Sequence, residues 1–432
     1  MTRKTGFAQL LQRFARRDDG AVAIIVALVL PVTLGMVALV EASRVYTVKN
    51  QLQITADAAA MASVKQVPSA TDVKSTAMDF AHRNMPADGQ FGDVLLEQDA
   101  VMGHWDVGTR VFTAGGGPAN AVRVVTRGEM PLFFAAALRS THAAFSDTPM
   151  SYSPAAQAIA LIRLDKCYRN GFVAGGIVEM NSSNSFDSGF CVYGRQGVTV
   201  NSANTFAPGT EVGMVDLATL DATLDHNPGL EEALVEKDIS APVAGEATQL
   251  LDDLLAGTGP MPAYITSTVT VSELPASPQA GTLYHVTGPV DLKLSGGLLQ
   301  SIGIISDQSI RIRSNSDLRN VLLGSRGSVD IDSNVEIGDV DFCQTGDGSS
   351  LIVSAGGVTG EQVETGSNIA LHGVQMVSDG DIVMNSNLTI TAASMQSTGD
   401  ISFNSSFDVA GCPEGTSANV TGNGTKVAQL VD

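Results

Sequence analysis

The feature that most constrains this chain is a run of twenty residues at 21–40, AVAIIVALVLPVTLGMVALV, which contains no charged side chain. As a helix, about 20 apolar residues rising about 1.5 Å each span a hydrocarbon core near 30 Å. Residues 1–20 hold five basic side chains against two acidic ones, and an excess of Lys and Arg marks the cytoplasmic side of a span. We therefore predict a cytoplasmic basic segment at 1–20, a single transmembrane helix at 21–41, and the bulk of the chain across the membrane.

The helical pattern continues beyond the predicted span. No Gly or Pro occurs between Met36 and Gln66, and apolar residues recur there at helical spacing. A cleaved secretory signal is disfavoured, because the apolar run is too long and Glu41 and Arg44 follow it instead of a small-residue cleavage site. We expect one helix of about 65 Å from Ala21 to Lys65. Its projecting half would dock an apolar stripe on a globular domain, as in a pilin-like stalk.

Residues along this helix and just after it form a recognisable series. An arginine-flanked Gly precedes a central Pro in the apolar run, an acidic residue near its end, a Gln-x-x-x-Asp-Ala-Ala-Ala helix and a Gly-His-Trp-Asp segment. The series resembles the N-terminal region of the TadE/TadG-like family of Tad (Flp) pilus assembly proteins, over roughly residues 14–163. The family-signature residues are Gly20, Pro31, Glu41, Asp57, Trp105 and Asp106.

The resemblance implies a role and a location. It implies a non-enzymatic component of Tad pilus assembly or secretion machinery, anchored by one span in the inner membrane with its bulk in the periplasm. The implied partners are other Tad pilus assembly proteins and the inner membrane itself. No cofactor, catalytic residue or metal ligand is implied, and homo-oligomerisation is left open.

The sequence departs from the pattern of the family at two points. Type IV pilins and TadE-type pseudopilins carry Glu five residues after the peptidase Gly, where this chain has Ile25. In the pilin class this Glu is thought to pair with the N-terminal amine of a neighbouring subunit during assembly, because a buried charge needs a partner. The absence of the Glu therefore argues against cleavage after Gly20 and against incorporation into a filament. It fits the TadG-like branch. Many TadG-like proteins continue with a von Willebrand factor A domain, but this chain departs at about Leu164 and has no Asp-x-Ser-x-Ser metal site.

Residues 42–165 are expected to form a pseudopilin-like α/β domain that includes the outer half of the stalk. A helix is predicted at Thr71–Arg83, with Thr71 as its N-cap. Strands are expected at 93–96, 101–105, 110–113, 121–126 and 156–164.

Beyond Lys166 a short pattern recurs. It consists of an apolar residue, any residue, a second apolar residue, a polar residue and then Ser. Neighbouring copies begin 19 or 20 residues apart, which is typical of one coil of a parallel β-helix with alternate residues inward and Asn or Ser at the corner. Degenerate copies are expected at 351–353 and 369–371. The clear copies begin at Val178, Val198, Ile310, Val329, Ile382 and Ile401.

The chain is therefore predicted to be α+β, with a long transmembrane helix, a small α/β domain and a right-handed parallel β-helix, or β-solenoid. Its first coils are placed at 166–206 and the others at 263–412, where stacked corner Asn residues can form amide ladders. An antiparallel β-sandwich is the alternative, although it would not repeat the same corner residues in one register. Residues 207–262 are expected to be an acidic helical insertion and 413–432 a C-terminal tail. The insertion's helices are expected at 216–224, 228–237 and 246–256.

Four cysteines, Cys167, Cys191, Cys343 and Cys412, lie beyond the predicted span. None forms a CxxC pair, so zinc-site spacing is absent. Outside the cytoplasm they are candidates for two disulfides, and four cysteines allow three connectivities. We prefer Cys167–Cys191, which brackets the first turn of the repeat region, and Cys343–Cys412 in its later half; the other connectivities stay open.

No recognised catalytic motif is present. A net charge of −20 argues against nucleic-acid binding, and the six histidines form no HExxH motif. Parallel β-helices often carry carboxylates for glycan chemistry, so a membrane-tethered glycan-active enzyme or a surface adhesin is the alternative function. We nevertheless expect no enzyme, because the solenoid offers few aromatic rings for sugar stacking. The side chains considered are Asp330, Asp332, Asp339, Asp341, Arg311, Arg313, Arg319, Arg326, Phe186, Phe206, Phe342, Phe403 and Phe407.

Overall fold

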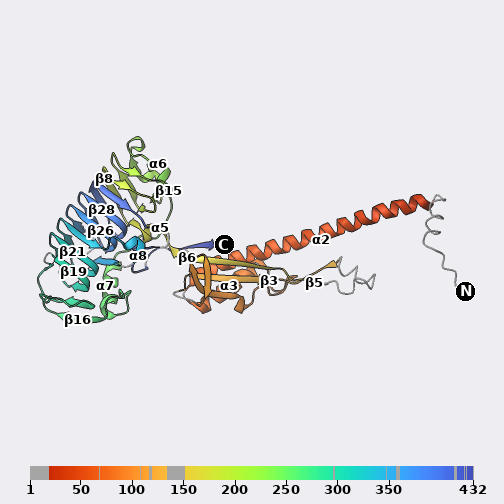
Figure 1. The fold of residues 1–432 in the computed structure, drawn as a ribbon, viewed down its shortest axis with the longest axis horizontal. Coiled ribbons are helices and arrows are strands. Elements are labelled where there is room, and N and C mark those ends of the chain that lie inside the picture. Colours follow the sequence, from red (N-terminus) through yellow and green to blue (C-terminus); the bar gives the residue numbers. More distant parts are fainter. Residues whose placement is uncertain are drawn as a thin grey trace. The chain divides into compact units, whose positions relative to one another are not determined.

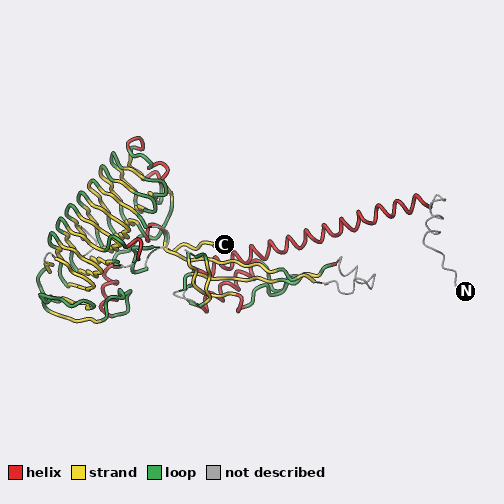
Figure 2. Tube along the Cα trace, viewed as in Figure 1, coloured by secondary structure: helices red, strands yellow, loops and turns green. Residues whose placement is uncertain are grey.

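The protein is represented by a computed structural model, which describes residues 19–67, 69–107, 109–115, 119–133, 151–294, 297–346, 348–356, 361–412, 416–422, 424 and 426–431. Residues 1–18 of the predicted basic segment lie outside this description. The chain divides into unit 1, Met1–Arg163 with Ala428–Asp432, and unit 2, Leu164–Val427. Unit 1 holds a long helix and a small sheet, and unit 2 is a stack of strands (Figures 1 and 2).

Unit 1 contains one continuous helix, α2 (Asp19–Ser63), followed by a 3₁₀ turn, η1 (Val64–Gln66). The prediction of a long N-terminal apolar helix is therefore confirmed. The large apolar side chains described between Ile25 and Val40 are exposed, whereas farther along an apolar stripe is buried within unit 1. That change divides the described helix into a part with exposed apolar side chains and a part that packs against unit 1. The buried stripe consists of Val48, Leu52, Ala56, Ala59 and Ala60.

A second helix, α3 (Ala70–Asn84), places Val73 and Ala77 in the same apolar cluster as Ala56, Ala59 and Ala60 of the α2 stripe. Its N-cap is Ser69, whose Oγ accepts a hydrogen bond from the N–H of Asp72 at 3.4 Å. The predicted N-cap, Thr71, is therefore wrong. Ser and Thr are both favoured caps, so two such residues close together do not reveal which one starts the helix.

The sheet of unit 1 has five strands in the order β2-β1-β3-β6-β31. The segment predicted as a strand at 93–96 forms no strand and leads into η2 (Glu97–Asp99). Residues 426–431, expected to belong to a tail, instead form the fifth strand beside β6. A pairing between strands so far apart in the chain cannot be predicted from a local sequence pattern. The strands are β1 (Ala100–Asp106), β2 (Val111–Ala114), β3 (Ala121–Arg127), β6 (Ala155–Leu164) and β31 (Lys426–Val431), with a separate pair β4 (Met130–Pro131) and β5 (Ser151–Tyr152).

Unit 2 is built from parallel strands, and all six clear copies of the repeat lie in one nine-stranded sheet. Neighbouring copies pair in register, so that Ile310 lies opposite Val329 and Ile401 opposite Val178. In spatial order the strands are β14 (Leu220–Ala222), β11 (Gly197–Val200), β8 (Ile177–Ser182), β29 (Ile401–Ser405), β27 (Asp381–Met384), β25 (Glu361–Thr365), β22 (Val329–Ile331), β20 (Ile310–Ile312) and β18 (Leu292–Leu294).

A second parallel sheet of fifteen strands completes the coils. The copies expected at 351–353 and 369–371 belong to this sheet, because β25 fills the vacant place in the first one. The main order is β15 (Leu234–Glu236), β13 (Glu211–Met214), β10 (Cys191–Gly194), β7 (Gly171–Ala174), β28 (Leu388–Ser397), β26 (Ile369–Ser378), β23 (Val335–Gly338), β21 (Ser316–Ser325), β19 (Gly297–Ser306), β17 (Thr282–Val286) and β16 (Ser267–Val271), with β24 (Ser350–Ser354), β30 (Phe407–Ala410), β9 (Ser185–Phe186) and β12 (Thr205–Phe206) beside it.

Apolar side chains from both sheets fill one continuous core. Ile310 and Ile312 are fully buried in it, while Arg311 between them is exposed. This alternation is the period-two pattern of the repeat, because successive side chains of a strand point to opposite faces. Each fully buried Val, Leu, Ile or Phe contributes about 1.5–3 kcal/mol relative to an exposed one.

The chain enters this stack in the middle. The first strands of unit 2, β7 and β8, pair with β28 and β29, which lie 223 residues later. Coils then continue through β10 and β13 to β15, and residues 237–266 lead to β16 at the other end of the sheet order. The remaining coils return from β16 to β30, which pairs with β9. Two separate runs of the chain therefore form one stack.

The segment expected to be a helical insertion at 207–262 is in large part a further coil. Its residues 211–236 contain β13, β14 and β15, with Val212, Met214 and Leu230 buried in the core. The helices expected at 216–224 and 228–237 are reduced to short turns, because their apolar residues serve the core. The turns are η4 (Leu217–Thr219), η5 (Leu224–His226) and α6 (Leu230–Ala233).

The third helix of that segment forms where it is expected. α7 (Glu246–Ala256) packs against the fifteen-stranded sheet through one apolar face. Asp379, 2% exposed at the end of β26, accepts hydrogen bonds from the N–H groups of Gly245, Ala247 and Thr248 at 3.0–3.1 Å. A carboxylate from the coils therefore caps the helix and holds it on the stack. The buried face consists of Ala247, Leu250, Leu251 and Leu254.

Asparagine side chains form the expected ladder along the stack. Asn404 donates to Asn385 at 2.8 Å, Asn181 donates to Asn404 at 3.3 Å, and Asn201 donates to Asn181 at 2.6 Å. Each amide is both donor and acceptor, so one residue type at the same corner of successive coils satisfies itself. The ladder crosses from β29 to β8 and so spans the junction between the two runs of the chain.

Candidate functional site

The Gln-x-x-x-Asp-Ala-Ala-Ala motif joins α2 to the sheet of unit 1. Gln53 donates through Nε2 to Asp57 Oδ1 at 2.8 Å and to the carbonyl of Gln157 in β6 at 3.1 Å. Ala59 and Ala60 are fully buried in the cluster that includes β3 and β6. Small side chains let the helix approach the strands closely, so this motif has a packing role.

The Trp-Asp pair likewise shapes the sheet. Trp105 is 5% exposed, and its backbone N–H donates to Asn120 Oδ1 at 2.7 Å, while Asn120 Nδ2 donates to the backbone carbonyl of Trp105 at 3.1 Å. Asp106 accepts a hydrogen bond from the N–H of Thr109 at 2.7 Å, which holds the turn after β1. The buried ring of Trp105 and the turn held by Asp106 are thus parts of the local structure of the sheet.

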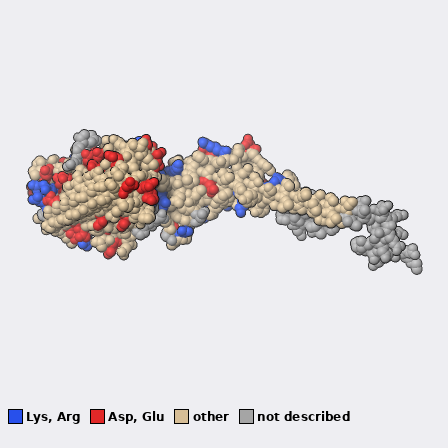
Figure 3. Space-filling model, turned by 90° about the horizontal axis from the view of Figure 1, so that it is seen from above, with Lys and Arg blue, Asp and Glu red and all other residues tan. Residues whose placement is uncertain are grey.

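The other signature residues lie along α2. Gly20 and Pro31 are inside the helix, and Glu41 is half-buried just beyond the exposed apolar part. Figure 3 shows a stretch of this helix bare of Asp, Glu, Lys and Arg, whereas acidic side chains form several patches on the visible face of unit 2. Within the described residues, one helix is long and apolar enough to cross a membrane, and its candidate segment is Ala27–Gln66.

A charged cluster surrounds the first disulfide. In the structure Cys167 is bonded to Cys191, and Lys237 Nζ lies 3.2 Å from Asp165 and 3.0 Å from Glu211. Burial on its own would raise the pKa of Glu211, but Lys237 and Lys166 outweigh it, so that pKa lies below its usual value. Cys167, Cys191 and Glu211 are close enough to hold a metal ion together, yet the two sulfur atoms are bonded to each other and leave no thiolate.

The second disulfide joins Cys343 in α8 (Phe342–Thr345) to Cys412. The two bonds have the connectivity preferred on sequence grounds.

His372 in β26 is 8% exposed, and its Nδ1 has no hydrogen-bond partner among the described residues. Burial lowers the pKa of His372, while Glu336 and Asp339 act in the opposite direction.

The side chains considered for glycan chemistry do not assemble a paired-acid site in the described residues. Arg311 binds Asp332 at 2.8 Å, and Asp339 accepts a hydrogen bond from the N–H of Asp341 at 3.0 Å. The other three arginines also lie within 4.0 Å of carboxylates, and all five phenylalanines are at most 5% exposed. A ring buried in the core cannot stack on a sugar. The arginines are Arg313, Arg319 and Arg326, and the rings are those of Phe186, Phe206, Phe342, Phe403 and Phe407.

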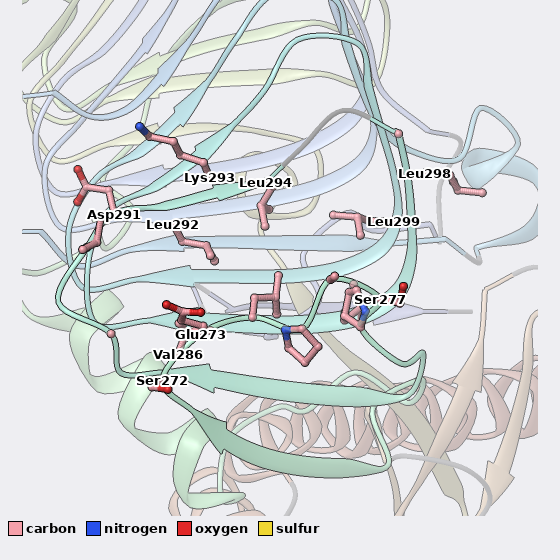
Figure 4. A pocket seen from close by; sticks show the side chains of 18 of the residues that line it. Ser272, Glu273, Ser277, Val286, Asp291, Leu292, Lys293, Leu294, Leu298 and Leu299 are labelled. Atoms are coloured by element: carbon pink, nitrogen blue, oxygen red, sulfur yellow. The ribbon is translucent and has the colours of Figure 1, made fainter.

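Unit 2 also holds a cavity of about 710 Å³ that sequence reasoning missed. It lies at the β16 and β18 end of the stack and is lined by Leu292, Leu294, Leu299 and the segment after β16 (Figure 4). The absence of a repeat copy between 263 and 291 is the signal that could have pointed to it. The coil that begins with β16 has no strand in the nine-stranded sheet, and this leaves the core open at that place.

The two units match different protein families. Residues 20–66 match the family model described as putative Flp pilus-assembly TadE/G-like, and residues 56–146 match the model described as putative Tad-like Flp pilus-assembly. The N-terminal region therefore carries pilus-assembly domains, which confirms the resemblance found in the sequence. Residues 171–293 match a domain of unknown function, DUF7867. No curated protein matches the chain.

Among solved structures, the crystal structure of the competence-associated pilin ComZ from Thermus thermophilus is similar, with 11% sequence identity. The alignment covers 88% of this chain and 98% of that chain, with a TM-score of 0.28. A superposition at that score does not establish a common fold.

Proposed function

We propose that this chain is a membrane-anchored, non-enzymatic component of Flp pilus assembly machinery that holds a parallel β-helix outside the inner membrane. The observation that carries the proposal is the pair of consecutive pilus-assembly matches over 20–66 and 56–146. They cover α2 and the strands β1, β2 and β3 of the unit 1 sheet, where Asp57 and Asp106 accept hydrogen bonds and Trp105 is buried.

The proposed anchor is the apolar part of α2. Its large side chains are exposed, although a soluble protein buries such a stripe, and the run at 21–40 is long enough to span a bilayer. The excess of basic residues at 1–20 favours a cytoplasmic N-terminus. Unit 2 and both disulfides would then lie in the periplasm, where such bonds persist.

Unit 2 is proposed to be a β-helix that acts as a rigid support for protein contacts. In-register parallel pairing over nine successive strands, an asparagine ladder and one continuous core favour this description. The glycan-active alternative gains no support from the described side chains, since its arginines are ion-paired and its aromatic rings are buried.

The proposal is tested by purifying the full-length protein from membranes of its native host in mild detergent and identifying what accompanies it by mass spectrometry. We expect other Flp pilus assembly proteins, and loss of surface pili when the gene is deleted. A matched variant with Leu28→Arg and Val37→Arg, both in the exposed apolar part of α2, should lose membrane retention and the associated proteins. Normal pili in the deletion strain together with no pilus protein in the purified material would contradict the proposal.

A further inference from the structure

One end of unit 2 is short of a strand. The fifteen-stranded sheet continues from β19 through β17 to β16, whereas the nine-stranded sheet stops at β18, which belongs to the coil of β17. Residues 272–281 connect β16 to β17 without a strand. Among the described strands, β18 therefore pairs only with β20, and its outer edge has free main-chain donors and acceptors.

The missing strand leaves a cavity beside this edge. Figure 4 shows Leu292, Leu294 and Leu299 projecting toward the space above the connecting segment, which includes Glu273. Leu294 is 3% exposed and belongs to the main core, so the cavity is an open extension of that core. The volume of about 710 Å³ falls in the range of about 300–1,000 Å³ that is common for binding pockets.

The outward face of the same edge carries Lys293, with the acidic Asp291 two residues earlier in the chain. Lys293 lies in register beside Arg311, and directly opposed like charges are unfavourable. Arg311 is paired with Asp332 at 2.8 Å, whereas no carboxylate of the described residues lies within 4.0 Å of Lys293. A strand added next to β18 is therefore favoured if it places an acidic side chain opposite Lys293.

We propose that β18 is the docking edge for an extended segment of a partner protein in which an acidic residue lies between two apolar residues. The segment adds to the sheet through main-chain hydrogen bonds, fills the cavity with its apolar side chains and sets its carboxylate beside Lys293. The chain contains its own example of this arrangement: in β22, Val329 and Ile331 point inward, and Asp330 lies in register beside Arg311.

A second copy of this chain is not the occupant that the charge at this edge favours. The strand that a facing copy would bring to β18 is β16, which extends one strand beyond it, and its sequence STVTV has no acidic side chain to set beside Lys293. The inference uses contacts within unit 2 alone and goes beyond the proposed role in pilus assembly, so each can fail without the other.

The test uses the full chain in detergent and a fluorescent synthetic peptide, GSVDIDSN, which copies residues 327–334. A second peptide replaces its first Asp with Lys, and a third, GSVDDISN, has the same composition but breaks the alternation by placing Ile on the opposite face. By fluorescence anisotropy we expect the first peptide to bind about 2- to 5-fold more tightly than the second, the range for one cross-strand charge pair. The third peptide should bind more weakly than the first, because its Ile side chain points away from the cavity when its Val side chain points into it.

Lys293→Glu should reverse the preference between the first two peptides, whereas the control Arg195→Glu, an exposed charge on the turn after β10, should leave it unchanged. Hydrogen exchange of the amides at 292–294 should slow when the first peptide is bound. Absence of binding, an unchanged preference in Lys293→Glu, or protection confined to other strands would overturn the proposal. Protection of 292–294 that appears without peptide, together with a doubled mass in light scattering, would assign the edge to a second copy and overturn it too.

Discussion

Replacing Asp379 with Ala should release the start of α7 from the parallel strands. The side chain of Asp379 accepts three backbone N–H bonds and a bond from the Thr248 hydroxyl, over 2.9–3.1 Å, in a site only 2% exposed. Loss of an N-cap costs about 0.5–2 kcal/mol, and a buried donor without a partner costs about 1–3 kcal/mol. Water reaches the freed N–H groups once the helix end lifts, so we expect a total of about 2–3 kcal/mol.

Hydrogen exchange followed by mass spectrometry measures this local opening in the full chain. A change of about 2–3 kcal/mol lowers the protection of the α7 amides about 30- to 160-fold. Asp379→Asn keeps one acceptor oxygen and should give an intermediate loss. The matched control is Asp225→Ala, an exposed acid on the end coil, with a change below about twofold. Unchanged protection in Asp379→Ala, or an equal loss in the control, would refute the reasoning.

Three further predictions concern unit 2. Because burial lowers the pKa of His372 below its usual 6.5, the unfolded chain binds this proton more readily, so stability should fall as the pH drops below about 6.5 and His372→Gln should flatten that decline in denaturant titrations. Phe403→Ala should cost about 3–5 kcal/mol in urea unfolding, since the ring is fully buried 4.6 Å from that of Phe172; a cost like that of exposed Tyr46→Ala would contradict its place in the core. Without reductant, iodoacetamide should leave the intact mass unchanged and digestion should release two cross-linked peptide pairs; four alkylated thiols would show that neither disulfide exists in the native protein.

The features that could be predicted from the sequence are those set by local periodicity. The long helix follows from an apolar run and a helical stripe without Gly or Pro, and the six strand copies follow from alternation at a fixed spacing. Their registers need no long-range information, because one copy presents to the next the same inward pair, such as Ile310 and Ile312 or Val329 and Ile331. The corner asparagines follow by the same reasoning.

The order of the coils could not be predicted in this way. Any coil of this length offers a similar edge to any other, so nothing near Val178 indicates that Ile401 is its neighbour. The acidic residues of 211–236 suggested exposed helices, although Val212 and Leu230 serve the core. The candidate sites divide likewise: the signature residues could be named from local motifs in the chain, but the open edge at β18 depends on a missing strand, which has no sequence of its own.

The most direct test of the whole account is the orientation of the full chain in the membrane of its native host. A protease added to spheroplasts should digest unit 2 and unit 1 beyond the apolar helix, while an epitope placed before residue 21 stays protected until the inner membrane is lysed. The account predicts that pattern, with all of the protein pelleting with membranes. Recovery of the chain in the soluble cytoplasmic fraction, or an intact unit 2 in protease-treated spheroplasts, would contradict it.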